Sequence, residues 1–395
     1  MGGAEITVFG EGAEKVRNGA TILYNKWVRK VKGKPKPGDL VEIYDDEGVF
    51  LGCGLYETVG PIAVRVMFHK PFYGNRYDAF YKLFSDALKR RKAIKYFDTG
   101  FYRLINSDGD CISGLIVDVY NDIVVIQSSS QAVDLALNDI VNIVVEILGK
   151  HVSIYEKSDQ KSRSNIGLLF RRRFIRGSKS ETIIHEGNSR FIVNVVYGQK
   201  TGFFLDQREN RLELEKLIEP NIRVLDLFSY TGGFGIHAAN AGANEVVFVE
   251  EDSKAVEVLK RNVELNGVRN FKIYCSNVWD ALPKLIGKGE KFDVIIVDPP
   301  AFIPSKEHYR RGVRAYFKLF SYIAKLVKEY TLVFLSSCSY FLHVEGFLKL
   351  IDEAFRKQGV NYVFLGSVRG QAKDHMFNVM TSYLNYLKSI FLTIT

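Results

Sequence analysis

Short apolar stretches alternate with amphipathic segments along the chain from residue 221 onward. Seven of these stretches have the length and composition of β-strands: "RVLDLFS", "EVVFVEE", "FKIYCSN", "FDVIIVDPP", "TLVFLSSCS", "NYVFLGSV" and "YLNYLKSIFLTI". Near-continuous apolar runs of this kind are typical of strands that helices bury on both faces. The pattern predicts an α/β fold with a Rossmann-like, mostly parallel, seven-stranded sheet.

In the first 70 residues, apolar and polar positions alternate with a shorter period. Apolar and polar residues alternate in "ATILYNKWVRKV", "DLVEIYDDEG", "FLGCGLYE" and "IAVRVMF", and Gly, Pro and Asp residues separate these stretches. Alternation that is bounded by turn residues predicts half-buried strands. We expect residues 1–70 to form a small all-β barrel.

The segment between these regions mixes both periods. It predicts a helix over 77–92, two strands around Asn121-Asp122, an amphipathic helix over 132–148, a strand over 151–157, a basic loop and a hairpin over 181–196. The order strand, strand, helix, strand, strand predicts a small α+β domain. The chain of 395 residues then divides into three domains, over residues 1–70, 71–197 and 198–395.

Composition narrows the class of protein. The four cysteines are widely spaced and form no CxxC pair, so the sequence predicts neither a metal site nor a disulfide framework. The richest apolar run, residues 331–348, is interrupted by Ser, His and Glu, which argues against a membrane span. The N-terminus lacks a basic-then-apolar signal pattern. We therefore expect a cytoplasmic protein.

The charge points to an anionic partner. The net charge is +9, which favours an anionic partner, nucleic acid above all. Basic residues gather in residues 27–36 and again in 157–176, where Asp159 is the one acid. The second cluster includes Arg171, Arg172 and Arg173. We expect these arginines to dock the substrate, although solvated basic faces are the plainer alternative.

A glycine-rich turn follows the first strand of the predicted sheet. Its candidate ligand-binding residues are Asp226, Ser229, Tyr230, Thr231, Gly232, Gly233 and Gly235. Ligands of such sheets bind at the carboxyl ends of the strands. An acid at this point repels a pyrophosphate but can face the sulfonium or amino group of S-adenosylmethionine. A nicotinamide site would more typically show GxGxxG directly after its strand.

The next two strands end in further candidates. Glu250 closes the second strand, and its carboxylate can accept hydrogen bonds from both ribose hydroxyls of a cofactor. A helix cap is the alternative role for an acid here, although Asp252 suits that role better. Asn277 follows the third strand and could bind the adenine amine.

The fourth strand ends in "DPPAF". Asp298 is followed by Pro299 and Pro300, which have no backbone N–H group. This loop therefore presents hydrogen-bond acceptors toward the ligand crevice at the ends of the strands. Acceptors there can hold the exocyclic amine of a base, with Phe302 as an aromatic neighbour. The alternative is a plain loop terminator.

The fifth strand ends in "LSSCSYF". Cys338 follows the strand, beside the place that Asp298 occupies after its neighbour. Methylation at carbon 5 of a pyrimidine requires activation, and a thiolate that adds to carbon 6 supplies it. A buried core thiol is the alternative for Cys338, and for Cys275 it is the preferred interpretation.

Several segments together resemble the 23S ribosomal RNA large-subunit methyltransferase I family. They are "SDGDCISGLIVDVYNDIVVIQ" (107–127), "GQKTGFFLDQRENR" (198–211), "FSYTGGFGIHAA" (228–239), "VDPPAF" (297–302), "RAYF" (314–317) and "SCS" (337–339). The resemblance covers essentially the whole chain. It implies an N-terminal PUA RNA-binding domain, a small central α+β domain and a class I methyltransferase domain. It also implies that the protein uses S-adenosylmethionine to form 5-methylcytosine in large-subunit ribosomal RNA.

The resemblance also implies roles for single residues. Cys338 takes the position of the nucleophile and Asp298 that of the acid that holds the base. Asp226, the turn 229–235 and Glu250 fall on cofactor positions. Four residues belong to the most specific segment, which should border the cofactor and the target base: Asp206 and Arg208 on the cofactor side, Lys200 and Gln207 on the base side.

The chain departs from related enzymes at three points. Many cytosine-5 RNA methyltransferases carry a second cysteine after the prolines, where Ala301 stands here. Tyr340-Phe341 replaces a polar continuation after "SCS", and "KDHM" keeps Asp374 and His375 without the following proline. These changes bear on the RNA target more than on the reaction type.

Three other functions stay open. An amine methyltransferase that acts on adenine or guanine would use "DPPAF" without a nucleophile. A ribosome-assembly factor would bind RNA and cofactor without turnover, and a nicotinamide oxidoreductase is least compatible with the glycine pattern. Monomer and homodimer are both compatible with the sequence.

Overall fold

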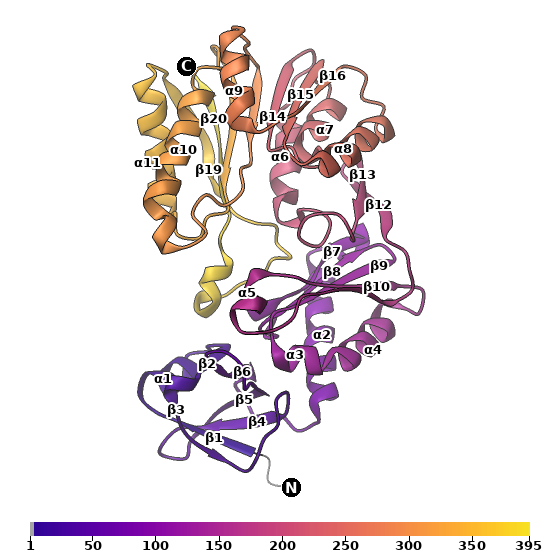
Figure 1. The fold of residues 1–395 in the computed structure, drawn as a ribbon, viewed down its shortest axis with the longest axis vertical. Helices are drawn as coiled ribbons and strands as arrows, with labels where there is room; N and C mark the ends of the chain where they lie inside the picture. The colour runs from indigo at the N-terminus through magenta and orange to yellow at the C-terminus, as the bar shows by residue number, and fades with distance from the viewer. Residues whose placement is uncertain (1–3) are drawn as a thin grey trace. The chain divides into compact units, whose positions relative to one another are not determined.

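The computed structural model describes residues 4–395, which form two compact units. The first unit contains residues 4–182, 193–205 and 373–384, and the second contains 183–192, 206–372 and 385–395. Each of the three larger sheets lies within one unit, the hairpin over 181–194 is divided between the units, and both units are drawn in Figure 1. The predicted boundaries at residues 70 and 197 stay predictions. No helix within residues 4–395 combines the length and apolar character that a bilayer span needs.

The N-terminal sheet of the first unit has six strands in the order β2-β6-β5-β4-β1-β3. The strands are β1 (Ala4–Val8), β2 (Ile22–Tyr24), β3 (Val28–Lys32), β4 (Leu40–Tyr44), β5 (Phe50–Tyr56) and β6 (Ile62–Phe68). The region also contains α1 (Gly10–Arg17), which the alternating pattern did not predict. A Cβ atom at Gly12 would lie 2.3 Å from the Cβ of Trp27, so this glycine lets α1 lie against the indole.

The second sheet of the first unit has the order β11-β10-β9-β8-β7. Its strands are β7 (Phe101–Asn106), β8 (Leu115–Tyr120), β9 (Ile123–Ser128), β10 (Ser153–Ser158) and β11 (Arg171–Arg176). Its helices are α2 (Arg76–Ala93), α3 (Gln131–Leu135), α4 (Leu137–Leu148) and α5 (Lys161–Asn165). The predicted helix over 132–148 is therefore divided at Ala136.

The basic segment 157–176 was expected to be a loop, and that prediction is wrong. The segment contains α5 and the edge strand β11, which pairs antiparallel with β10. Glu156 of β10 lies opposite Arg173 of β11 in the register. Carboxylates beneath the arginines relieve their mutual repulsion, so a run of three arginines can occupy a strand.

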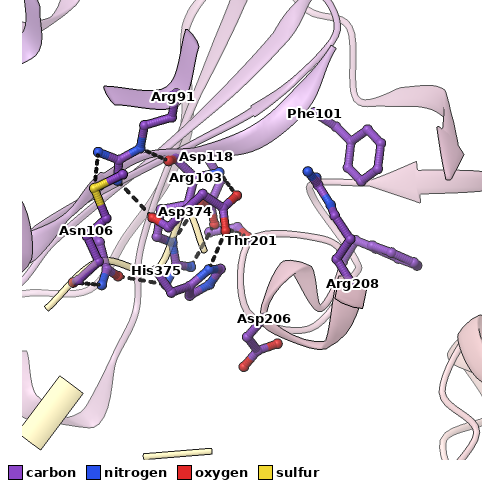
Figure 2. Close-up of polar contacts among 12 residues, drawn as sticks. Arg91, Phe101, Arg103, Asn106, Asp118, Thr201, Asp206, Arg208, Asp374 and His375 are labelled. Atoms are coloured by element: carbon purple, nitrogen blue, oxygen red, sulfur yellow. Dashed lines mark hydrogen bonds and ion pairs between the residues drawn. The ribbon is translucent and has the colours of Figure 1, made fainter. Parts of the chain in front are cut away.

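A buried polar network lies at β7 and β8 (Figure 2). Arg103 donates hydrogen bonds from Nε and Nη2 to the two carboxylate oxygens of Asp118, at 2.8 and 2.9 Å. The Thr201 hydroxyl donates to Asp118 at 2.7 Å, and the Asp374 carboxylate accepts from the backbone N–H of Arg103 at 2.9 Å. The network therefore fixes the segments around residues 201 and 374 to this sheet.

A two-stranded hairpin, β12 (Glu181–Glu186) and β13 (Ser189–Asn194), confirms the predicted one. It carries Glu186, which is buried and lies at the start of the second unit.

The second unit contains the predicted seven-stranded sheet, in the order β16-β15-β14-β17-β18-β20-β19. Its strands are β14 (Arg223–Leu227), β15 (Glu245–Glu250), β16 (Phe271–Cys275), β17 (Val294–Val297), β18 (Leu332–Ser337), β19 (Tyr362–Arg369) and β20 (Lys388–Ile394). All pairs are parallel except those that β20 makes with β18 and β19. The predicted Rossmann-like fold class is confirmed.

Helices cover both faces of this sheet. They are α6 (Arg208–Leu217), α7 (Gly233–Asn240), α8 (Ser253–Leu265), α9 (Val278–Gly287), α10 (Tyr309–Ile323) and α11 (Val344–Lys357). The face of Leu225 and Ile295 packs against α9, α10 and α11 in one continuous core. Phe334 faces the other way and packs against Phe234 of α7. The central strands are therefore buried on both sides, as their apolar runs predicted, whereas the edge strands β16 and β19 are largely exposed.

Candidate active site

The carboxyl ends of three neighbouring strands meet at one edge of the seven-stranded sheet in the second unit. In the register of β14, β17 and β18, Leu227 lies beside Val297, and Val297 lies beside Leu335. The residues that follow these three therefore begin at the same level. This places the glycine-rich turn, Asp298 and the Cys338 loop at the edge where such sheets bind ligands.

The glycine-rich turn needs its glycines for packing. Gly232 has φ +87°, and a Cβ there would lie 2.4 Å from the Leu259 side chain. A Cβ at Gly235 would lie 2.3 Å from the Phe248 ring and 2.9 Å from the Asp226 carboxylate. The turn therefore brings backbone N–H groups close to the end of β14. One of them, that of Gly235, donates to Asp226 at 2.8 Å.

Asp226 is a buried carboxylate without a cationic partner among residues 4–395. Burial raises its pKa to about 8, Asp298 and Glu250 add to the rise, and the Gly235 N–H opposes it. A carboxylate in this state is stabilised by an incoming cation. The site therefore fits the positive charges of S-adenosylmethionine.

Two further residues of the turn bear on a ligand. The Ser229 hydroxyl donates to the Val249 carbonyl at 3.4 Å, which ties the turn to β15. The Oγ1 atom of Thr231 is buried and makes no hydrogen bond within residues 4–395. An unsatisfied buried hydroxyl is costly, so a ligand that bonds to Thr231 would gain affinity.

Glu250 shapes the turn from the end of β15. Its carboxylate accepts from the backbone N–H groups of Tyr230 at 2.7 Å and Asp252 at 2.9 Å. Burial raises the pKa of Glu250. Asp252, and not Glu250, caps α8, because its side chain accepts from the Lys254 N–H at 3.0 Å. The Glu250 oxygens retain acceptor capacity beyond two hydrogen bonds, so the ribose contact stays a prediction.

Asn277 has a structural role that the sequence did not predict. Its side chain caps α9 by accepting from the Trp279 N–H at 2.9 Å, and its amide donates to Glu251. The predicted contact between Asn277 and adenine stays a prediction.

Asp298 is held by residues from two other elements. Its Oδ1 atom accepts from Gln207 Nε2 at 2.8 Å and from the Ser336 hydroxyl. Asn210 donates to the Gln207 side-chain oxygen at 2.6 Å and fixes which way that amide points. Gln207, predicted to touch the base, therefore orients the carboxylate of Asp298.

Cys338 lies directly beside the "DPP" loop. Its Sγ atom is 3.8 Å from the Pro299 carbonyl oxygen, and the residue is half-buried. The hydroxyl of the buried Tyr316 lies 2.9 Å from Ser337 Oγ and 3.0 Å from Ser339 Oγ, the neighbours of Cys338 on either side. The thiol is therefore carried on a loop that is fixed at both flanks.

Lys388 is a site residue that the sequence analysis missed. Its buried ammonium donates to the carbonyls of Ser339 at 2.7 Å, Tyr386 at 2.8 Å and Ser337 at 3.5 Å. Burial lowers the pKa of Lys388 to about 8, and Cys338 acts in the opposite direction. A cation beside a cysteine favours its thiolate. The one feature of the sequence that could have identified Lys388 is the presence of a lysine at the start of the apolar strand β20.

Phe302 belongs to an aromatic cluster below the loop. Its ring lies 4.8 Å from that of Tyr316 and 5.9 Å from that of Trp279, centroid to centroid. Pro299 is buried and Pro300 is exposed. The predicted contacts of these residues with a base stay predictions.

Asp206 and Arg208 also lie in the second unit. Asp206 accepts from the Tyr386 hydroxyl at 2.6 Å. Arg208 is buried with its Nε atom 3.7 Å from Glu186, a carboxylate that also binds Arg211. These contacts are structural, and the predicted cofactor contacts of Asp206 and Arg208 stay predictions.

The remaining predicted residues lie in the first unit. The ammonium of Lys200 lies 4.4 Å from the centroid of the Phe204 ring. Each arginine of the predicted docking cluster has a carboxylate partner. The pairs are Arg171 with Asp134 at 3.4 Å, Arg172 with Asp159, and Arg173 with Glu156 at 2.8 Å.

Comparisons with known proteins agree with this geometry. Residues 6–68 match the PUA-like domain family, and residues 210–334 match a family described as conserved hypothetical protein 95. Two known structures share the whole fold. One is provisionally described as a SAM-dependent methyltransferase of Streptococcus mutans, with 25% identity, a TM-score of 0.80, and 98% and 99% of the two chains covered. The other, a provisionally named methyltransferase complexed with SAH, shows 25% identity, a TM-score of 0.81 and the same coverage.

Two relatives are closer in sequence. A Methanocaldococcus jannaschii protein, provisionally named a ribosomal RNA large subunit methyltransferase, is 38% identical over 90% of this chain and 89% of its own. The ribosomal RNA large subunit methyltransferase I of Aeromonas salmonicida is 33% identical over 93% of both chains. Identity at this level over nearly the full length confirms the resemblance. This chain belongs to the ribosomal RNA large subunit methyltransferase I family.

Proposed function

We propose that this protein is an S-adenosylmethionine-dependent methyltransferase that forms 5-methylcytosine in large-subunit ribosomal RNA. Family membership supports the coarser part, methyl transfer to ribosomal RNA. One observation carries the finer part: Cys338 lies 3.8 Å from the "DPP" loop, at the edge shared with Asp298 and the glycine-rich turn. An amine methyltransferase needs no thiol at this place.

The cofactor would lie over the glycine-rich turn. Asp226 would pair with a positive charge of S-adenosylmethionine, Glu250 would accept from its ribose hydroxyls, and Thr231 would donate to it. Bound there, the cofactor supplies an electrophilic methyl group. These roles are consistent with a relative solved with SAH.

Cys338 and Asp298 would activate the base. The thiolate adds to carbon 6 of the cytosine, a C–S bond forms, and the electron pair of the 5,6 double bond makes carbon 5 nucleophilic. Asp298, held by Gln207 and Ser336, would accept from the exocyclic amine and keep the ring in place. After carbon 5 is methylated, loss of its proton restores the double bond and expels the thiolate.

The experiment combines product analysis with trapping of the adduct. The purified protein is incubated with methyl-labelled S-adenosylmethionine and transcribed large-subunit ribosomal RNA, and the RNA is digested to nucleosides. We expect label in 5-methylcytidine and, in cells, a bisulfite-resistant cytosine that depends on the gene. Label in an N-methylated purine would instead support the amine methyltransferase.

Fluorine at carbon 5 offers a sharper test. RNA that contains 5-fluorocytidine has no carbon-5 proton to lose, so the thiol cannot leave after methylation. We expect a protein–RNA adduct that survives denaturant, requires the cofactor and is absent in Cys338→Ala. An adduct that persists in Cys338→Ala would contradict the assignment of the nucleophile.

A further inference from the structure

Helix α10 carries an exposed basic face that the sequence analysis did not assign. Arg310, Arg311 and Arg314 are all solvent-exposed. Residues 310 and 314 lie one turn apart on the same side, about 6 Å along the helix axis, and 311 lies next to them. The three guanidinium groups therefore form one compact patch, the α10 patch.

The α10 patch has no counter-charge of its own. None of its three arginines makes an ion pair or a side-chain hydrogen bond with any residue from 4 to 395. In the first unit, by contrast, Arg171 and Arg173 pair with carboxylates of the protein. Unpaired clustered arginines repel one another, so an anion that binds all three relieves a cost that the fold leaves in place.

Close backbone packing fixes the patch beside the reactive loop. A Cβ at Gly312 would lie 2.5 Å from the Phe302 carbonyl oxygen and 2.3 Å from the Ile303 side chain, so α10 lies directly against the "DPPAF" loop. One turn further, Tyr316 of the same helix bonds to the serines that flank Cys338. The arginines project from a helix whose opposite side forms the floor of the site.

Exposed aromatic rings lie at the start of α10 and on the Cys338 loop. Tyr309, which begins α10, is 42% exposed, and Tyr340, two residues after Cys338, is 43% exposed. Aromatic rings interleaved with arginines are typical of surfaces that bind single-stranded RNA, since bases stack on the rings and phosphates bind the guanidinium groups. This combination favours RNA over an acidic protein.

We propose that the α10 patch binds the phosphates of the RNA strand that delivers the target base. The inference rests on the proposed function, because it assumes that RNA is the substrate. Arginine suits this role because its planar fork contacts a phosphate through two N–H groups. The patch would hold the strand while Cys338 and Asp298 act on a base turned out of it.

The salt dependence of RNA binding tests this assignment. The triple variant R310Q/R311Q/R314Q and the full-length wild-type protein are titrated with transcribed large-subunit ribosomal RNA from about 50 to 200 mM salt. Each lost phosphate contact should lower the slope of log Kd against log salt by about 0.7. We expect the slope to fall by about two, with Kd at least about a hundredfold weaker at 50 mM salt and about tenfold or more weaker at 200 mM. Cofactor binding, measured by calorimetry, should not change.

The matched control removes three charges from another helix of the same unit. K349Q/R356Q/K357Q changes exposed residues of α11 and has the same net charge as the test variant. A wild-type slope for the α10 variant, or an equal loss in the α11 control, would overturn the proposal. Methyl transfer is measured in parallel, because wild-type protein that methylates no RNA would overturn the proposed function itself.

Discussion

Two of the basic regions of the protein, β11 and α10, differ in how their charges are balanced. On β11, the run of arginines that dominates the sequence lies over Asp134, Glu156 and Asp159, and each arginine is neutralised by a neighbour. On α10, Arg310, Arg311 and Arg314 have no such partners within the described chain. We therefore expect a basic cluster to bind an anionic ligand only when its side chains have no carboxylate partners in the folded protein.

The same contrast holds for buried carboxylates. Glu186 is fully buried between Arg211 and His237, and these neighbours lower its pKa. Asp226 is equally buried but faces one N–H group, and its pKa rises to about 8. The charge of Glu186 is balanced within the fold, whereas at Asp226 we expect a ligand to supply the opposite charge.

Removal of the thiol should separate chemistry from binding. We expect Cys338→Ala to lower the rate of methyl transfer by at least about 10³-fold, because the carbon 6 adduct cannot form. RNA affinity, its salt slope and cofactor affinity should not change. Cys275→Ala is the control and should retain full activity; Cys275 was expected in the core, and that prediction is wrong, because the residue is exposed at the end of the edge strand β16. Turnover that survives Cys338→Ala would favour amine methylation.

Loss of the unbalanced carboxylate should weaken cofactor binding. We expect Asp226→Asn to raise the Kd for S-adenosylmethionine by about 30-fold or more, since a buried charge loses its partner. The wild-type protein should release about one proton on binding at pH 6.5, because the cation converts a protonated Asp226 into a carboxylate. Calorimetry in buffers of different ionisation enthalpy counts that proton. Asp280→Asn, exposed on α9, is the control.

Asp226→Asn should weaken cofactor binding but stabilise the ligand-free protein at high pH. The folded-state pKa of Asp226 lies above its unfolded value, so the ligand-free protein loses stability as pH rises from about 4 to 8. Asp226→Asn removes this loss. Without ligand, we therefore expect the variant to have a higher Tm than the wild-type protein at pH 9 and a similar Tm near pH 4. A lower Tm at pH 9 would contradict the raised pKa.

Loss of a balanced carboxylate should destabilise the first unit. Asp374 accepts from the Arg103 N–H at 2.9 Å and lies 2.8 Å from the ring of His375. We expect Asp374→Ala to lower the free energy of unfolding by about 2 kcal/mol, because a buried donor is left without its acceptor. Chemical denaturation measures the loss. Asp374→Asn, which keeps one acceptor oxygen, should lose less.

The smallest change in RNA affinity should come from removal of a carboxylate that pairs with the β11 arginines. Glu156→Gln removes the carboxylate that holds Arg173 at 2.8 Å and lies 3.8 Å from Arg171. We expect RNA to bind a few-fold more tightly at low salt, with a salt slope steeper by about 0.7. Filter binding measures both. If R171Q/R172Q/R173Q weakened binding as much as the α10 variant, the contrast between the two regions would fail.

The sequence predicted the centre of the seven-stranded sheet because β14, β15, β17 and β18 are buried, and their Val, Ile and Leu runs leave little ambiguity. β11 escaped prediction because its arginines are stable on a strand only above carboxylates such as Glu156 and Asp134. Those partners are supplied by tertiary contacts and not by local pattern. Helix α1 begins at a Gly-Glu-Gly stretch with poor helix propensity, and its packing against Trp27 decides the outcome.

The candidate site was predictable where residues follow strands directly. Asp226, Glu250, Asp298 and Cys338 each end or follow a strand, so strand prediction alone brings them to one edge. Lys388 was not predictable, because the carbonyls that it binds at Ser337 and Ser339 lie about fifty residues earlier in the chain. Gln207 likewise gained its role toward Asp298 only from the folded arrangement.

The path of the chain between the two units limits how they can be exchanged by recombination. The chain passes from one unit to the other after residues 182, 192, 205, 372 and 384. The family-specific segment 198–211 is itself divided, since it belongs to the first unit up to Leu205 and to the second from Asp206. A single recombination point anywhere between residues 183 and 384 would leave both units incomplete. The second unit is therefore not exchangeable as one uninterrupted segment, because residues 193–205 and 373–384 of the first unit lie within its span.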